Sequence, residues 1–204
     1  MATKQGSYER GKLGDKILYV VDGRQHERSM PAHVANPRTE AQQAHRSAFV
    51  EVVRLSSRMT EAHTIGLHRH AQRQHLRTYM DFRKLNKDCF TPDGEIDYPR
   101  IVLSHGPVAK VYFTSVHIDE SHTVRLTFNA NLNAGNATTT DDLYLFAYCP
   151  ACCSGHLFAP VPRTDESLTA QLPTEWPVSD LHLYAFLRSR RGYTSDTIYI
   201  PITS

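Results

Sequence analysis

The chain has 204 residues, of which 40% are hydrophobic and 22% are charged, and its formal net charge at pH 7 is +2. This composition is typical of a soluble globular protein, and the length can bury a sizeable core as one domain or as two small ones. The longest apolar runs are only a few residues, so the sequence excludes a membrane-spanning helix.

The first residues, "MATKQGSYERGKLGDK", contain no apolar core and no small-residue cleavage site. They therefore do not resemble a secretory signal, and we expect a cytoplasmic protein or one that is exported without a signal.

The small net charge hides a difference between the two halves. Residues 1–100 contain 17 Lys and Arg against 12 Asp and Glu, whereas residues 101–204 contain 6 against 9. The first half therefore carries +5 and the second −3. A basic first half favours an anionic partner, although an excess of this size is common.

The first half is predicted to form a hairpin followed by helices. In "KILYVVDGRQHERSMP" an apolar strand precedes Asp22-Gly23, a pair suited to a two-residue turn, and Pro31 is expected to end the second strand. Thr39 and Gln42 match a capping box, and the apolar spacing behind them predicts a helix over residues 40–58.

A second helical region is predicted over residues 60–87, either as two shorter helices or as one kinked helix. Gly66 lies within it, where glycine breaks a helix or marks close packing.

The second half contains seven short strand-like runs separated by turn-rich segments. The runs are "VAKVYFTSVHI", "HTVRLTFNANL", "DDLYLFAYC", "GHLFAPV", "SLTAQL", "DLHLYAFLRS" and "TIYIPI". Seven short strands in about 100 residues are typical of a small antiparallel sandwich. We therefore predict an α+β protein, with a hairpin and helical part over residues 1–98 packed on a β-sandwich over residues 99–204.

Two of these strands are apolar on both faces, which predicts that they lie side by side at the centre of a sheet. One face of the pair carries only aromatic side chains, namely Tyr144, Phe146, Tyr148, Tyr184 and Phe186. If this face is exposed, it is a binding surface for a sugar, a peptide or another protein. If it is covered, it is the seam on which the helices pack, and we favour the seam because the helices must bury their own apolar sides.

The order of these elements resembles an uncharacterised Bacteroidetes domain-of-unknown-function family over almost the whole chain. The matching pieces are "GKLGDKILYVVDGRQHERSMP", "NPRTEAQQAHRSAF", "GEIDYPRIVLSHG", "ATTTDDLYLFAYCP" and "LHLYAFLRSRRGYTSDTIYI". The resemblance implies a helical N-terminal part joined to a fibronectin- or immunoglobulin-like sandwich, and it brings no activity or site residue. The "NPRTEAQQAHRSAF" piece also resembles segments near the start of some phage and prophage proteins. The "CPACCSGH" segment departs from the family pattern.

That segment places Cys149, Cys152 and His156 close together in sequence, where two thiolates and an imidazole are candidate zinc ligands. A closed zinc site needs a fourth ligand, and no second cysteine pair is present. A redox-active cysteine pair of the thioredoxin type lies at the start of a helix, whereas here the cysteines are followed by another predicted strand. A hairpin turn with incidental thiols is therefore favoured over a metal site.

Three arginines, Arg69, Arg73 and Arg77, stand four residues apart, and Lys84 extends the same series. On a continuous helix they would form one basic stripe suited to phosphates, so nucleic acid is the alternative partner. A solvated helix face is the simpler interpretation. Four histidines between residues 63 and 75 show no spacing of four and no metal-binding motif.

The sequence contains no nucleophile elbow, phosphate-binding glycine loop, dinucleotide fingerprint or kinase motif. We therefore predict a non-catalytic structural or interaction protein without a cofactor. Its expected partner is another protein or a second copy, and the phage-like segment makes a virion-associated component one form of this role. The alternatives are a nucleic-acid-binding protein and, less favoured, a metal-binding protein. The small-molecule ligand, if there is one, is not predicted.

Overall fold

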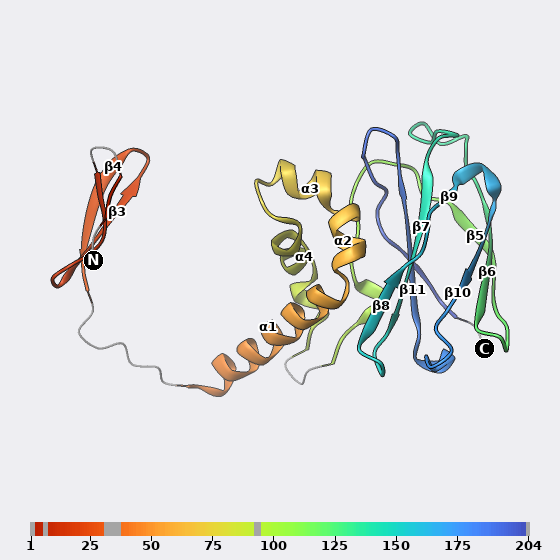
Figure 1. Ribbon diagram of the computed structural model, residues 1–204, viewed down its shortest axis with the longest axis horizontal. Coiled ribbons are helices and arrows are strands. Elements are labelled where there is room, and N and C mark those ends of the chain that lie inside the picture. The colour runs from red at the N-terminus through yellow and green to blue at the C-terminus, as the bar shows by residue number, and fades with distance from the viewer. Residues whose placement is uncertain (1–2, 6–7, 31–37, 92–94, 203–204) are drawn as a thin grey trace. The chain divides into compact units, whose positions relative to one another are not determined.

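The computed structural model describes residues 3–5, 8–30, 38–91 and 95–202, and the chain divides into two compact units, Met1–Thr39 and Glu40–Ser204. The four helices and three antiparallel sheets make this a mixed α+β fold, as expected (Figure 1). The boundary expected at residues 98 and 99 does not separate compact units, because the helices and the later strands belong to the second unit.

The first unit is a four-stranded antiparallel sheet in the order β1-β2-β3-β4. Its strands are β1 (Thr3–Gln5), β2 (Tyr8–Leu13), β3 (Lys16–Val21) and β4 (Arg24–Ser29). The predicted hairpin is confirmed, and Asp22 and Gly23 take the positive φ angles of 49° and 73° that its two-residue turn requires. The predicted end at Pro31 lies outside the described residues. Strands β1 and β2 were not predicted, because they contain few apolar residues.

The second unit begins with four helices: α1 (Glu40–Arg58), α2 (Thr60–Gly66), α3 (His68–Arg73) and α4 (Thr78–Asn86). The first matches its predicted range, and the second predicted helical region divides into three short helices. Gly66 ends α2 and packs closely, because a Cβ atom there would lie 2.3 Å from the Leu103 carbonyl oxygen. None of the helices in the described ranges has the length and apolar character needed to cross a membrane.

All seven strand-like runs contain strands. A three-stranded sheet in the order β10-β6-β5 contains β5 (Tyr112–Ile118), β6 (Thr123–Asn129) and β10 (Ser167–Gln171). The second sheet, in the order β12-β11-β7-β8, contains β7 (Asp142–Cys149), β8 (Ser154–Leu157), β11 (His182–Arg188) and β12 (Ile198–Ile200). The short strand β9 (Val161–Pro162) also pairs with β7.

The two sheets of the second unit share one hydrophobic core. Leu126 of β6, Leu145 of β7 and Leu183 of β11 are at most 1% exposed and belong to the same buried cluster. Strand β6 alternates as predicted, since Val124, Leu126 and Phe128 are buried while the residues between them are exposed. The pairing of β7 with β11 confirms that the two doubly apolar strands are neighbours.

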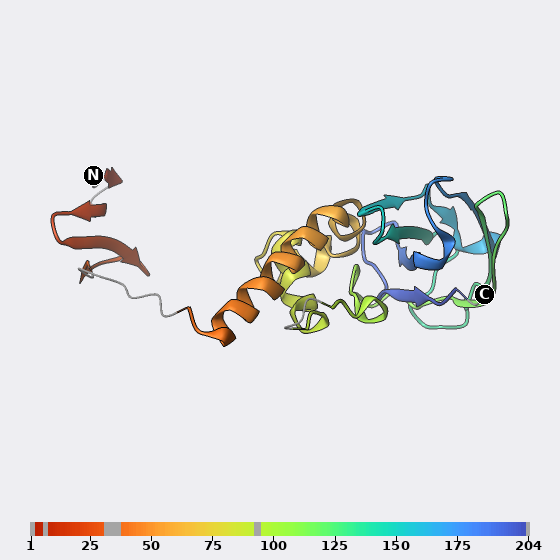
Figure 2. The ribbon, with the colours of Figure 1, turned by 90° about the horizontal axis from the view of Figure 1, so that it is seen from below.

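The helices cover the opposite face of the β7–β11 pair (Figures 1 and 2). Phe146, Tyr184 and Phe186 are fully buried and Tyr148 is 5% exposed, in one cluster with residues such as Leu55 of α1. Tyr144 is half-buried and stacks on Phe186. The alternative in which this aromatic face is an open interaction surface is therefore wrong, because the apolar sides of the helices occupy it.

An arginine side chain is buried completely in the second unit. Arg163, in a turn between β9 and β10, has 0% exposure and lies 3.2 Å from the equally buried carboxylate of Asp141. Its guanidinium also donates hydrogen bonds to the carbonyl oxygens of Ala109 and Ala130. The pair therefore connects three loops at one end of the two sheets.

Replacing Arg163 should destabilise the second unit strongly. We expect Arg163→Met to lower the free energy of unfolding by about 3–5 kcal/mol, because the buried Asp141 carboxylate loses its countercharge. The matched control is Arg125→Met, which breaks an exposed pair with Asp119 and should cost less than about 1 kcal/mol. Urea unfolding followed by circular dichroism measures both, and equal losses would contradict the structural role of Arg163.

A buried histidine links α1 to α2. His63 is 1% exposed, and its Nε2 lies 3.0 Å from the Ser56 carbonyl oxygen, to which the neutral ring can donate. Its Nδ1 is buried and has no hydrogen-bond partner among the described residues. Burial lowers the pKa of His63 below its usual value, because the charged ring would lose its hydration.

This histidine should make the second unit sensitive to acid. The folded state resists protonation of His63 just below the ordinary imidazole value of about 6.5, whereas the unfolded state does not. Stability is therefore complete above that pH and falls as the pH decreases towards the lowered pKa, by at most about 1.4 kcal/mol per pH unit for one proton. His63→Gln keeps a donor for Ser56 and should flatten the dependence measured by urea unfolding between pH 7.5 and 5.5.

His117→Gln, at an exposed position on β5, is the control for this experiment. It should leave the pH dependence unchanged. His182, whose pKa burial also lowers, accounts for part of the acid sensitivity that remains in His63→Gln. An unchanged slope in His63→Gln would show that His63 does not contribute.

Candidate functional site

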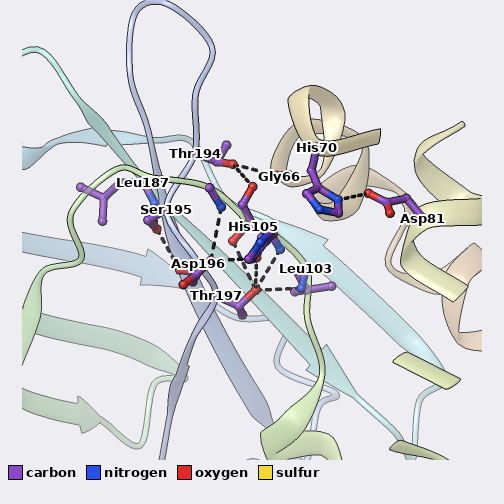
Figure 3. Close-up of polar contacts among 12 residues, drawn as sticks. Gly66, His70, Asp81, Leu103, His105, Leu187, Thr194, Ser195, Asp196 and Thr197 are labelled. Atoms are coloured by element: carbon purple, nitrogen blue, oxygen red, sulfur yellow. Dashed lines mark hydrogen bonds and ion pairs between the residues drawn. The ribbon is translucent and has the colours of Figure 1, made fainter. Parts of the chain in front are cut away.

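A small pocket lies where three segments of the second unit meet. Arg69, His70 and Arg73 of α3 form one side, and the loops that contain His105–Pro107 and Tyr193–Thr194 form the others. The cavity measures about 210 Å³ and is open to solvent on one side. This is smaller than the roughly 300–1,000 Å³ of drug-sized ligand sites, so it suits a single small group. Figure 3 shows the polar contacts around it.

Threonine side chains and a glycine hold the three segments together. Thr197 Oγ1 accepts hydrogen bonds from the backbone amides of Leu103 and Ser104, both at 2.8 Å. Thr194 Oγ1 donates to the Gly66 carbonyl oxygen at 2.9 Å and so attaches the same loop to the end of α2 (Figure 3). Gly106 approaches Thr194 so closely that a Cβ atom would lie 2.3 Å from its carbonyl oxygen.

Two histidines at this site are each held by an aspartate. His70 Nδ1 lies 2.6 Å from Oδ2 of Asp81, a fully buried carboxylate on α4, and His105 Nδ1 lies 2.7 Å from Oδ1 of Asp196 (Figure 3). The two rings meet edge to face with their centroids 4.7 Å apart. Each aspartate therefore orients its ring through Nδ1, and neither Nε2 has a hydrogen-bond partner within the described ranges.

Two guanidinium groups lie beside these rings. The Cζ atoms of Arg69 and Arg73 are 5.3 Å and 5.6 Å from the centroid of the Tyr193 ring, within the range of cation–π attraction. Arg69 Nη2 also donates to the Arg191 carbonyl oxygen at 2.9 Å. Because a guanidinium has five N–H donors, most of them remain available to a ligand.

The arrangement is better suited to an anion than to a metal cation. Guanidinium groups repel a cation but match the oxygens of phosphate, sulfate or carboxylate. In the part of the chain that the structure describes, no cluster of three or more His, Cys, Asp or Glu side chains could hold a metal ion. Each oriented imidazole can carry a proton at Nε2, and it then adds an N–H donor to the pocket.

The predicted basic stripe is only partly present. Arg69 and Arg73 are in α3, but the helix ends at Arg73 and the chain turns at His75, whose φ is +54°. Arg77 therefore precedes a separate helix, α4, and Lys84 lies within that helix. The single stripe required a continuous helix, and that condition is not met because the left-handed residue His75 interrupts the helix.

The cysteine segment forms the turn between β7 and β8. Cys149 is buried, Cys152 and Cys153 are exposed, and the His156 ring packs edge to face on Phe158. A hydrogen bond with Cys149 raises the pKa of Cys152 to about 11, so this thiol stays protonated near neutral pH. Cys149, Cys152 and His156 do not form a three-ligand site in the described structure.

Four residues of this site, His105, Asp81, Asp196 and Tyr193, were not predicted from the sequence. They come from three segments up to 115 positions apart, and none of them belongs to a recognisable motif. The one signal that pointed here was the spacing of Arg69 and Arg73. The basic segment Arg188–Arg191 also adjoins the site, since it leads directly into Tyr193 and its backbone accepts the bond from Arg69.

Comparison with known proteins identifies a family but no activity or ligand. No curated protein and no solved structure matches the chain. One family model matches residues 7–201, which cover nearly the whole sequence and include strands β2 to β4 of the first sheet and the pocket. The chain therefore belongs to DUF6266, a family of unknown function.

Proposed function

We propose that this protein is a non-catalytic interaction protein whose pocket binds a phosphate group. The observation that carries the proposal is the convergence of two guanidinium groups and two aspartate-oriented imidazoles on one small cavity. Arg69 and Arg73 would hold the phosphate oxygens through paired N–H donors, and His70 and His105 would donate from Nε2 when their rings are protonated.

The charge of the pocket depends on whether its two imidazoles carry a proton. With both imidazoles neutral, the two arginines are offset by Asp81 and Asp196. With both imidazoles protonated, the His–Asp pairs are neutral and the arginines supply a net charge of +2. The pocket therefore attracts an anion most strongly when both imidazoles are protonated.

A phosphate group on a nucleic acid or on a small phosphorylated molecule would satisfy the same donors. Arg188, Arg190 and Arg191 adjoin the pocket, and Arg188 and Arg69 both lie within 4 Å of a Cβ atom placed on Gly192. This extended basic surface favours a phosphodiester chain that continues beyond the pocket. It replaces the single-helix stripe as the surface for our nucleic-acid alternative.

The assignment of the two later sheets to an immunoglobulin-like sandwich is also part of this proposal. The strand orders β5-β6-β10 and β8-β7-β11-β12 correspond to strands A-B-E and C′-C-F-G of an immunoglobulin-like sandwich. Sandwiches of this type serve in many recognition proteins, which supports an interaction role by fold analogy alone. A virion-associated or prophage-encoded form of this role stays a prediction from the phage-like segment.

Substitutions in the pocket should weaken phosphate binding. We expect inorganic phosphate to bind the full chain saturably in NMR titrations, and Arg73→Gln to weaken it about 10- to 100-fold through loss of a charged hydrogen bond. Arg125→Gln, on the exposed face of β6, is the matched control and should bind like the parent. Parallel titrations with adenosine monophosphate and with a single-stranded oligonucleotide distinguish a small phosphorylated ligand from a nucleic acid.

Three results decide between these interpretations. An oligonucleotide that binds at least tenfold more tightly than the mononucleotide, with a steep salt dependence, would favour nucleic acid. Equal affinities would favour a small phosphorylated ligand. No shift of pocket resonances up to about 10 mM phosphate, or equal loss in the Arg125→Gln control, would reject the phosphate site.

A further inference from the structure

The first part of α1 lies outside the hydrophobic core. No residue of this helix before Val52 is buried, and Phe49 and Val50 are 53% and 44% exposed. Figures 1 and 2 show this half of α1 extending beyond the other helices. A helix of about ten residues is marginal in water on its own, so this half would gain stability from a covering partner.

A groove runs between this part of α1 and α4. Its apolar floor consists of Ala48, Phe49 and Val52, and the cavity measures about 280 Å³. Arg83 and Lys84 of α4 and Lys87, which directly follows it, form the other side, and His45 completes the rim. An apolar floor with charges of one sign along its edge has the layout of a groove that accepts an amphipathic helix.

The cations along this groove have no acidic partners within the described structure. None of Arg83, Lys84 and Lys87 forms an ion pair with a carboxylate there. The Arg83 guanidinium lies 4.9 Å from the centroid of the Tyr79 ring, and its Nε is buried without a hydrogen-bond partner among described residues. The positive charges of these three side chains are therefore available to an acidic partner.

We propose that the α1–α4 groove docks an acidic amphipathic helix of another protein. Apolar side chains of that helix, spaced three and four residues apart, pack on Phe49 and Val52. Its Asp and Glu residues pair with Arg83, Lys84 and Lys87. This site is separate from the phosphate pocket and does not depend on it.

A second copy of the chain fits the groove less well. Two α4 helices brought together would place Lys84 and Lys87 opposite the same cations of the other copy, which is repulsive. The acidic residues of α1 are Glu40 and Glu51, and Glu51 already pairs with Arg54 at 2.6 Å. The charges of the groove therefore favour a partner richer in carboxylates than this chain.

Selection from a displayed library of 16-residue helical peptides against the full chain tests this proposal. The enriched peptides should carry apolar residues at i, i+3 or i+4, and i+7, with an excess of Asp and Glu. Synthetic copies, measured by fluorescence anisotropy, should bind Phe49→Ser and Lys84→Glu/Lys87→Glu at least about tenfold more weakly than the parent. Tyr112→Ser and Lys110→Glu, at exposed positions near β5, are the matched controls and should bind normally.

Several outcomes would overturn the proposal. Enriched peptides without acidic excess, or peptides that bind the groove variants as tightly as the parent, would place recognition elsewhere. A failure to enrich any groove-dependent peptide would have the same meaning. Sedimentation showing a parental dimer that Phe49→Ser dissociates would assign the groove to a second copy of the chain.

Discussion

Strands β7 and β11 carry apolar side chains on both faces, and every other layer of the second unit packs against one of those faces. Leu145 and Leu183 face the three-stranded sheet, while Phe146 and Tyr184 face the helices, and all four are fully buried. Burying both faces removes far more apolar area from water than a one-sided sheet could. It also binds the helices to the strands, so residues 40–202 behave as one unit rather than as a helical part and a separate β domain.

The candidate pocket is a product of this docking. Helix α3 contributes arginines, the segment before β5 contributes His105, and the loop between β11 and β12 contributes Tyr193 and Asp196. Each segment lies at an edge of the helix–sheet seam, where the apolar contact ends and polar groups can reach solvent. The Thr194–Gly66 and Thr197–Leu103 hydrogen bonds fix the segments to one another. The α1–α4 groove lies in the helical layer, where α1 extends past the part that the sheet needs.

Local patterns predicted most of the strands and the first helix, because alternation and helical spacing are properties of a few consecutive residues. The two-faced strands also predicted their own pairing and the seam. Local patterns did not predict the position of the break after Arg73. His75 takes a left-handed conformation there, and a histidine in the sequence does not indicate that conformation. Local patterns failed again at the His–Asp pairs, because the partners of His70 and His105 are fixed by tertiary contacts alone. The buried Arg163 was equally hidden, since its turn looks like any exposed polar loop.

The Thr194–Gly66 hydrogen bond spans 128 residues, and Arg69 meets Arg191 across 122. Contacts this distant along the chain close large loops, which costs entropy and slows folding. The proposed anion pocket cannot form in a fragment that lacks the loop between β11 and β12, and during synthesis it is completed only after that loop has left the ribosome. The residues of the pocket therefore assemble late, and an anion bound there would report that the second unit has reached its final topology.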